Sequence, residues 1–178
     1  MAQNIRIETE RLLLRRFSER DAEDLYAILG DEEAMAYLEP AYDFAKTKRF
    51  LLDFCIRRNG AVAAEHKESR RVIGYLLFHE TEPGEFELGW VFLRDIWRRG
   101  YAFEACRALI DDAFSRQNAL RLFAQTTDSV RSVALMRKLD MRCEEVQRQP
   151  ISFPNGGADL YRFVLTKADR EAMRGPRC

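Results

Sequence analysis

The feature that most constrains the fold is a row of three strand-like segments in the middle of the chain. Branched and aromatic side chains dominate residues 61–66, 71–79 and 85–93, and the connecting pieces KESR and TEPG have turn composition. Connections this short join neighbouring antiparallel strands, whereas a parallel connection needs about a dozen residues or more. We therefore expect an antiparallel meander of three strands.

A helix, a strand and a second helix follow the meander. The apolar pattern predicts a long helix over 101–117, a strand over 121–127 and a helix over 129–139. This order adds a parallel crossover to the meander, which gives a mixed sheet with helices on its faces. The expected class is α/β in the mixed α+β sense, with a twisted, mostly antiparallel sheet flanked by helices.

The two ends of the chain fit this class. Residues 11–17 have the pattern of a strand, and Ser18 offers a helix N-cap, with Asp21 three residues later to hold the first turn. Two last strands, near 143–149 and 159–166, flank a loop rich in Pro and Gly. No internal repeat or linker interrupts the sequence, so a single domain over 1–178 is expected. Helices are expected over about 18–30, 31–37 and 43–59.

The charge balance argues against two classes of partner. Lys plus Arg and Asp plus Glu both number 29, so no net field would hold nucleic acid or an anionic membrane. No apolar run approaches the roughly 20 residues that span a bilayer, and MAQNIRIETER is too polar for a secretory signal. We expect a cytoplasmic monomer or homodimer that binds neither nucleic acid nor membrane.

Neither the cysteines nor the histidines have the spacing of metal ligands, and no metal is expected. Free cysteine packs as a small hydrophobe, so we expect the first three cysteines to be buried. His66 and His79 fall in strand segments, where packing is the expected role rather than catalysis. The cysteines lie far apart: Cys55, Cys106, Cys143 and Cys178.

Residues 93–102, LRDIWRRGYA, join a predicted strand to a predicted helix. The first N–H groups of a helix lack internal partners and can bind a diphosphate. Gly100 allows close approach of the backbone, Ala102 keeps the first turn uncrowded, and Arg98 and Arg99 add positive charge. A plainer alternative is that both arginines are solvated and Gly100 is an ordinary loop residue. The chain has no GxxxxGK[ST] and no GxGxxG, which argues against P-loop and Rossmann sites.

Two longer motifs resemble a known family. Residues 9–15, TERLLLR, are similar to the opening strand of Rim-type ribosomal-protein N-terminal acetyltransferases. Residues 88–90, LGW, followed by 97–105, WRRGYAFEA, are similar to the cofactor motif of that branch. Over about residues 7–167 the chain therefore resembles the GNAT superfamily of N-acetyltransferases, and its Rim-type branch in particular.

The resemblance implies a GNAT-like fold, acetyl-coenzyme A as co-substrate and a primary amine as acceptor. It also implies two sets of backbone contacts to the cofactor. The pyrophosphate would be bound by the N–H groups of Arg98, Arg99, Gly100, Tyr101 and Ala102. The pantetheine arm would pair with the strand residues Val91, Phe92 and Leu93.

The chain departs from the family pattern in three places. Trp97 stands where Gln or Arg is frequent, as is common in the Rim-type branch, and Arg98 replaces a frequent Gly. Residues 129–132, SVRS, stand where the family usually has Asn-x-x-Ser, so Ser129 offers a weaker cofactor contact than Asn would. Residues 140–141, DM, replace the usual Gly-Phe. Cofactor binding is still expected, since the phosphate contacts are mostly made by the backbone.

Attack on a thioester requires a neutral amine, so a group must accept the proton. At pH 7, deprotonation costs about 1 kcal/mol for an α-amine of pKa ~7.8 and roughly 4.6 kcal/mol for a lysine of pKa ~10.4. A weak base therefore suffices for an α-amine. Glu87 is the candidate, because it lies on the strand in phase with Gly89, Val91 and Leu93. The alternative is a structural or solvent-facing carboxylate.

The leaving thiolate must also be stabilised. Many superfamily members have a tyrosine seven residues beyond the Asn position, where this chain has Met136, which cannot donate a proton. Ser132 is therefore expected near the thiolate, directly or through water. Helix capping, together with Ser129, is the alternative role. A backbone N–H of Phe92 or Leu93 would polarise the thioester carbonyl.

By resemblance, the acceptor pocket lies between the early helices and the loop near 150–160. Four acids give the early region an acidic character that suits a cationic amine, although such a run is often a solvated face: Asp31, Glu32, Glu33 and Glu39. Tyr37, Tyr42 and Phe153 are either pocket walls or core residues.

The sequence thus favours an N-acetyltransferase acting on a protein or peptide N-terminus. A small amine such as an antibiotic, a polyamine or an amino acid is the alternative acceptor. Two further hypotheses are a non-catalytic acyl-coenzyme A sensor and a nucleotide-binding module unrelated to coenzyme A.

Overall fold

The computed structural model describes residues 5–153 and 156–174, whose strands form one mixed sheet. The strand order is β1-β2-β3-β4-β5-β6-β8-β7, and β5 and β6 are the parallel pair among antiparallel neighbours. The predicted sheet is confirmed. The strands are β1 (Arg6–Glu8), β2 (Leu12–Arg16), β3 (Ala61–His66), β4 (Val72–Glu82), β5 (Glu85–Phe92), β6 (Arg121–Thr126), β7 (Arg142–Phe153) and β8 (Gly156–Thr166).

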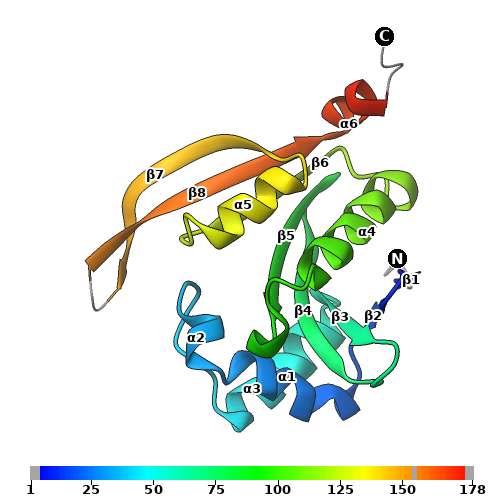
Figure 1. The fold of residues 1–178 in the computed structure, drawn as a ribbon, viewed down its shortest axis with the longest axis vertical. Coiled ribbons are helices and arrows are strands. Elements are labelled where there is room, and N and C mark those ends of the chain that lie inside the picture. Colours follow the sequence, from blue (N-terminus) through cyan, green and yellow to red (C-terminus); the bar gives the residue numbers. More distant parts are fainter. Residues whose placement is uncertain (1–4, 154–155, 175–178) are drawn as a thin grey trace.

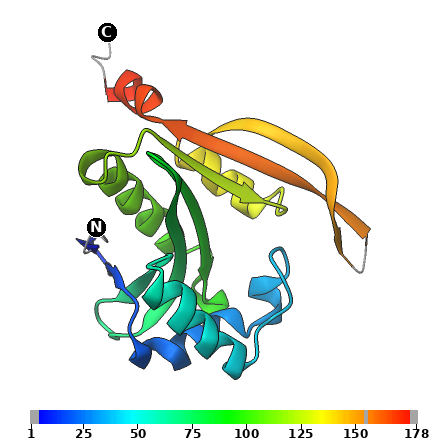
Figure 2. The same ribbon diagram turned by 180° about the vertical axis from the view of Figure 1, so that it is seen from behind.

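Helices pack on both faces of this sheet (Figures 1 and 2). Alternate residues of β5 point to opposite faces, so Leu88 joins one hydrophobic cluster and Val91 the other. The first cluster contains Leu109 of α4 and Val133 of α5, and the second contains Leu25 of α1 together with residues around α3. The α-helices are α1 (Ala22–Leu29), α2 (Glu32–Met35), α3 (Phe44–Phe50), α4 (Tyr101–Arg116), α5 (Arg131–Lys138) and α6 (Lys167–Arg174).

The central meander has the predicted order and nearly the predicted bounds. Strands β3 and β4 pair Ala63 with Tyr75, and β4 and β5 pair Leu76 with Trp90. The first five residues of both β3 and β4 are buried, because helices cover both faces of the sheet there. The branched and aromatic composition of these segments therefore reflects burial on two sides.

A buried ion-pair network fixes the entry to α1. The Asp21 carboxylate accepts hydrogen bonds from the Ser18 N–H and from Arg15 Nη1, both at 2.8 Å. Arg15 Nε donates to Glu65 on β3 at 2.7 Å. The predicted N-terminal box at Ser18 and Asp21 is present, but a 3₁₀ turn over Glu19–Asp21 precedes α1.

The predicted third helix consists of two types of helix in succession. An α-helix runs to Phe50 and a π-helix continues over Leu51–Arg57, which the hydrophobic period alone does not distinguish. The predicted stop at Asn59-Gly60 has a clear geometry, since Asn59 has a φ of 53°. A Cβ atom on Gly60 would lie 2.4 Å from the Phe54 ring, so only glycine allows this close approach.

The C-terminal strands are longer than predicted. Strands β7 and β8 form a hairpin that extends beyond the helices in Figure 1 and takes up most of the expected loop over 152–159. Residues 154–155 of that loop and Cys178 lie outside the described residues. Helix α6 was not predicted. Cys55 and Cys106 are buried as expected, whereas the prediction for Cys143 is wrong, because it lies exposed on the edge strand β7.

Within residues 5–153 and 156–174, no helix is long and apolar enough to cross a membrane.

Candidate active site

The parallel strands β5 and β6 separate after a short stretch of pairing. Register links Glu85, Phe86 and Glu87 to residues 121–123, although β5 continues to Phe92 and β6 to Thr126. Beyond Glu87 the two strands diverge (Figure 1). A cleft lies between them and is also lined by residues of α4 and α5.

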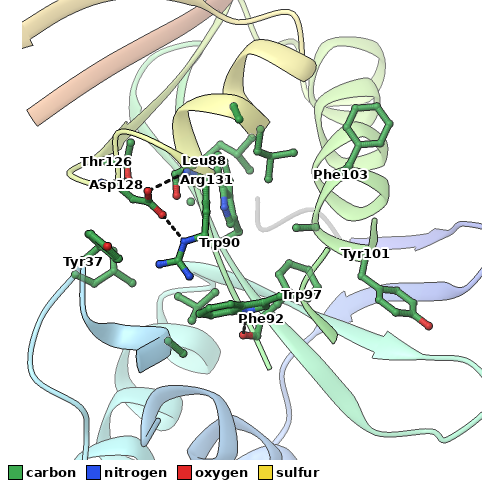
Figure 3. Close-up of a pocket in the computed structure, with 18 of the residues that line it drawn as sticks. Tyr37, Leu88, Trp90, Phe92, Trp97, Tyr101, Phe103, Thr126, Asp128 and Arg131 are labelled. Atoms are coloured by element: carbon green, nitrogen blue, oxygen red, sulfur yellow. Dashed lines mark hydrogen bonds and ion pairs between the residues drawn. The ribbon is translucent and has the colours of Figure 1, made fainter. Parts of the chain in front are cut away.

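One edge of β5 faces this cleft without a strand partner. The Leu93 N–H donates to Ile73 on β4 at 3.0 Å, so alternate residues back along β5 turn their backbone groups toward β4. The intervening residues Trp90 and Phe92, which lie beyond the last paired position, turn theirs toward the cleft. The Phe92 carbonyl accepts the Trp97 indole N–H there at 2.9 Å (Figure 3).

The connection from β5 to α4 is a tight turn with two left-handed residues. Arg98 has a φ of 63° and Gly100 a φ of 84°. The first backbone bond of the helix runs from the Glu104 N–H to the Gly100 carbonyl at 3.0 Å. The N–H groups of residues 100–103 therefore have no backbone acceptor within the described chain. They form the partly positive end of a helix of 16 residues.

Residues 9–11, with the sequence TER, directly precede β2 and hold this turn in place through hydrogen bonds. The Glu104 carboxylate accepts hydrogen bonds from Thr9 Oγ1 at 2.5 Å and from Arg11 Nε at 2.7 Å. Arg11 Nη1 donates to the Arg99 carbonyl at 2.9 Å, and the guanidinium lies 4.0 Å from the Tyr101 ring centre. Burial opposes ionisation of Glu104, but the bonds from Thr9 and Arg11 outweigh it and lower the pKa of this carboxyl.

The cleft has a volume of about 750 Å³ and brings most of the predicted cofactor residues together. Arg99 and Leu93 do not line it, and their N–H groups are already bonded, to the Ile96 carbonyl at 3.3 Å and to the Ile73 carbonyl at 3.0 Å. The predicted residues that line it are Glu87, Val91, Phe92, Arg98, Gly100, Tyr101, Ala102 and Ser132.

Glu87 lines the cleft at the point where β5 and β6 separate. Its cross-strand partner is His79, whose Nε2 lies 3.8 Å from Glu87 Oε2. The His79 ring packs edge-on against Phe54, and its Nδ1 is buried without a hydrogen-bond partner in the described chain. His79 thus packs within the sheet as predicted, and it also stands beside the candidate base.

Helix α5 is capped by Asp128 rather than by a serine. The Asp128 carboxylate accepts the N–H groups of Val130 at 3.0 Å and Arg131 at 2.9 Å. Ser129 is exposed and does not line the cleft, so the capping role considered for it is not seen. Ser132 does line the cleft, while Met136 is buried in the first hydrophobic cluster.

The early helices supply the other wall of the cleft. Glu33 lines it, and its carboxylate accepts Arg94 Nη1 at 2.9 Å. Tyr37 and Leu38 also line it and are 45% and 51% exposed. Tyr42 instead belongs to the second hydrophobic cluster. The side chain of Phe153 lies outside the described residues.

Two of the remaining acids of this region, Asp31 and Glu39, have local partners. The Asp31 side chain caps α2 by accepting the Ala34 N–H at 2.8 Å. Glu39 accepts the Tyr42 hydroxyl at 2.5 Å and Lys46 at 3.1 Å. Much of the acidic character seen in the sequence is therefore neutralised in the fold.

Two residues that line the cleft, Arg131 and Asp128, were not predicted from the sequence as site residues. Arg131 points into the cleft between the rings of Tyr37 and Trp97 (Figure 3). Asp128 holds the Arg131 Nε at 3.0 Å and is itself only 5% exposed. A sequence signal for this pair exists, since an acid three residues before an arginine at a helix start fits an N-cap with a local ion pair.

Within the described chain no group of three or more His, Cys, Asp or Glu side chains is arranged to hold a metal ion.

Comparison with known proteins gives concordant results. The family model of the acetyltransferase (GNAT) domain matches residues 11–142. The uncharacterized N-acetyltransferase YnaD of Bacillus subtilis is 28% identical over 172 residues, which covers 92% of this chain and 98% of YnaD.

Solved structures share the fold over nearly their whole length. A GNAT-family acetyltransferase from Bacillus anthracis superposes with a TM-score of 0.85 at 24% identity, covering 92% of this chain and 99% of that one. RimL, a ribosomal L7/L12 α-N-protein acetyltransferase in complex with coenzyme A, superposes with a TM-score of 0.80 at 17% identity, covering 91% and 98%.

The separated strands, the free helix N-terminus and the matched domain agree on one assignment. The chain belongs to the GNAT family of acyl-coenzyme A-dependent N-acetyltransferases.

Proposed function

We propose that this acetyltransferase transfers the acetyl group of acetyl-coenzyme A to the α-amine of a protein or peptide N-terminus. The observation that carries the proposal is the cleft itself, where a free strand edge, a free helix N-terminus and the Glu87 carboxylate meet.

The residues of the cleft fit the cofactor that the family uses. The N–H groups of residues 100–103 are without backbone acceptors and suit the oxygens of a pyrophosphate. The turn residues Arg98, Gly100, Tyr101 and Ala102 would hold that group, and Arg98 and Lys138 add positive charge at the cleft. The free edge at Trp90 and Phe92 suits the amides of a pantetheine arm, which would add like a short strand.

The chain supplies the groups that the reaction needs. Glu87 accepts the proton of the attacking amine, whose nitrogen forms a bond to the acetyl carbon as the bond to sulfur breaks. Ser132 donates a hydrogen bond to the departing sulfur, directly or through water. The Phe92 N–H, on the free edge of β5, would polarise the carbonyl. Acetyl-coenzyme A would supply the activated thioester and leave as coenzyme A.

Two observations favour an N-terminal α-amine over a lysine or a polyamine. A single carboxylate is a weak base, and at pH 7 an α-amine costs only about 1 kcal/mol to deprotonate. The wall of the cleft formed by the early helices, here called the acceptor wall, also has the exposed side chains of Tyr37 and Leu38. Exposed apolar side chains are expected of a surface that contacts a larger partner. Small amines remain the second candidate class of acceptor.

The test is release of free thiol from acetyl-coenzyme A across a panel of N-terminal peptides, lysine side chains, polyamines, amino acids and aminoglycosides. We expect the highest kcat/KM with peptides that have a free α-amine. Activity restricted to small amines would transfer the assignment to the second class. Tight cofactor binding without thiol release from any acceptor would identify a non-catalytic acyl-coenzyme A sensor. Thermal stabilisation by ATP but not by coenzyme A would instead indicate an unrelated nucleotide site.

A further inference from the structure

Arg131, the first residue of α5, places a positive charge beside the wall of the cleft that the early helices form. Its guanidinium carbon lies 4.6 Å from the Trp97 ring centre and 5.2 Å from the Tyr37 ring centre. Figure 3 shows the group between these two rings, with Tyr101 and Phe103 of the cofactor turn on the far side of the cleft. Two aromatic faces thus hold the plane of the guanidinium.

The orientation of Arg131 is fixed by an anchor that leaves part of the group free. Its Nε donates to Asp128 Oδ2 at 3.0 Å. The same carboxylate accepts two backbone N–H groups at the start of α5, so it is itself immobile. Nη1 and Nη2 have no hydrogen-bond partner among residues 5–153 and 156–174. Arg131 therefore offers two unused donors, held in one direction, to whatever occupies the cleft.

The position of Tyr37, on the wall of the cleft opposite to the turn before α4, is also fixed. Thr127 Oγ1 donates to the Tyr37 carbonyl at 2.9 Å, which links the segment after α2 to the segment before α5. Tyr37 is thereby held over Arg131, and the free donors lie in a preformed recess.

The free guanidinium nitrogens of Arg131 favour a negatively charged group on the acceptor. The pantetheine arm of coenzyme A is uncharged, and the pyrophosphate of the cofactor is assigned to the turn before α4, so neither of these parts requires a cation here. A guanidinium with two parallel N–H groups matches a carboxylate in a bidentate arrangement. Glu87 lines the same cleft and would accept the proton of the amine.

We propose that Arg131 binds a carboxylate of the acceptor, so that the preferred substrate is an amine with an acidic group close to it. This inference rests on the proposed function and specifies its substrate class: a peptide N-terminus with Asp or Glu among its first residues. The α-carboxylate of a free amino acid would offer the same chemistry, and the experiment separates these two sources.

The experiment compares matched peptides that differ at the second residue, with sequences starting Ser-Glu, Ser-Gln and Ser-Lys, and free serine as the amino-acid arm. For the unmodified enzyme we expect kcat/KM at least tenfold higher for Ser-Glu than for Ser-Gln, and lowest for Ser-Lys. Arg131→Gln should reduce the Ser-Glu to Ser-Gln ratio to about one, while Arg131→Lys should keep part of it. Affinity for coenzyme A should stay within twofold in both variants.

The control is Arg137→Gln, the same substitution on the same helix at an exposed position that does not line the cleft. It should leave the peptide ratio unchanged. Calorimetric binding of the three peptides to the enzyme–coenzyme A complex repeats the comparison without turnover. A preference seen in binding but without thiol release would therefore contradict the proposed function and leave the role of Arg131 supported.

Three results bear directly on the inference. An equal kcat/KM for Ser-Glu and Ser-Gln, or a ratio that survives Arg131→Gln, would overturn it while leaving the acetyltransferase assignment intact. Loss of coenzyme A affinity in Arg131→Gln with an unchanged peptide ratio would also overturn it, because the arginine would then serve the cofactor. Free serine acetylated in preference to the peptides, again only with Arg131 present, would support carboxylate binding and identify an amino acid as the source.

Discussion

At the scale of single residues, two backbone conformations shape the turn that precedes α4. Arg98 and Gly100 both have positive φ values, of 63° and 84°. A left-handed conformation costs a residue with a side chain roughly 1–2 kcal/mol, whereas glycine adopts it freely. The strain at Arg98 lies at a cleft-lining position, as is common where a turn must present its N–H groups to a ligand.

Gly100→Glu should abolish coenzyme A binding. The substitution sets a negative charge beside the helix N-terminus that would hold the phosphates, and it forces a side chain into a left-handed conformation. We expect the affinity measured by calorimetry to fall by at least a hundredfold. The matched control is Gly84→Glu, since Gly84 also has a positive φ, of 77°, and does not line the cleft. Gly84→Glu should lose stability but keep its affinity, and an unchanged affinity in Gly100→Glu would refute this cofactor site.

Glu87→Gln should lower kcat by about 10²- to 10⁴-fold, the usual contribution of a general base. Without the carboxylate only amine that is already neutral reacts, so the pH–rate profile should move upward toward the pKa of the α-amine, about 7.8. Coenzyme A affinity should not change. Glu82→Gln on β4, exposed and outside the cleft, is the control and should behave as the unmodified enzyme. An unaltered pH profile in Glu87→Gln would remove this residue from the mechanism.

The sequence predicted site residues where a local motif carries the chemistry. The turn with Arg98 and Gly100 is a contiguous strand-to-helix junction, so its own residues together with the family resemblance were enough to propose a cofactor role for it. Arg131 was not predicted, because its position between Tyr37 and Trp97 depends on three segments that are distant in the sequence. The proximity of His79 to Glu87 likewise required the register of β4 and β5, which the sequence does not fix.

At the scale of secondary-structure elements, the segment before β2 acts as a support for the start of α4. Thr9 and Arg11 hold Glu104 in the first turn of the helix, and Arg11 also holds the Arg99 carbonyl. This explains in physical terms why the TER residues and the cofactor motif resemble the same family, although they are some 90 residues apart: the pair Thr9 and Glu104 is separated by 95 positions. A support of this kind holds the turn with the free N–H groups at the cleft.

Arg11→Gln should therefore weaken cofactor binding without removing any residue that lines the cleft. We expect coenzyme A affinity to fall about tenfold, and the free energy of unfolding to fall by about 2 kcal/mol, since charge-assisted hydrogen bonds are worth roughly 1.5–3 kcal/mol each. Calorimetry and urea unfolding measure the two effects. Arg6→Gln on β1, whose side chain is 62% exposed, should change neither quantity. Full affinity in Arg11→Gln would show that the turn holds its shape without this support.

The elements themselves were predicted well where a single repeating pattern extends over the whole segment. Strands β3, β4 and β5 and helix α4 agree with their apolar patterns to within a few residues. The change from α3 to a π-helix was missed because both forms place apolar residues on one face. Helix α6 was missed because its sequence, KADREAMR, offers little apolar surface and its position depends on β8.

At the scale of the whole molecule, helices cover both faces of one sheet, and β5 and β6 diverge (Figures 1 and 2). A hydrophobic cluster lies on each face, and the cleft lies where the two strands diverge. The cofactor turn and α5 belong to the face of the first cluster, and the acceptor wall around α2 belongs to the side of the second. In the proposed reaction the cofactor therefore enters from one face of the sheet and the acceptor from the other. Glu87 lies between them, where β5 and β6 diverge.

The buried network around Asp21 links these parts to the stability of the whole fold. Burial opposes ionisation of Asp21, but hydrogen bonds from Arg15 and Ser18 outweigh it and lower the pKa of this carboxyl. A lowered folded-state pKa contributes stability above the unfolded pKa of about 3.9, and that contribution is lost as pH falls through the folded value. The free energy of unfolding should therefore decrease as pH is lowered from about 5 toward 3.

Asp21→Asn should remove that contribution at all pH values. We expect a loss of about 3–5 kcal/mol at pH 7, because the substitution leaves the buried Arg15 with one ionic partner fewer, and a shallower loss of stability between pH 5 and 3. Urea unfolding at several pH values measures both. Asp53→Asn, which breaks an exposed pair with Arg57, should cost about 0.5 kcal/mol or less. An acid transition as steep as that of the unmodified protein would mean that other carboxylates dominate it.

The central claim is that amide hydrogens at the start of α4 bind the pyrophosphate of coenzyme A while the free edge of β5 receives the pantetheine arm. A crystal structure of the protein grown with excess coenzyme A measures this most directly. The account predicts phosphate oxygens within about 3.2 Å of backbone nitrogens in the turn from Arg98 to Phe103, and amides of the arm beside Trp90 and Phe92. Cofactor bound elsewhere, or a turn left without phosphate at saturating coenzyme A, would contradict it.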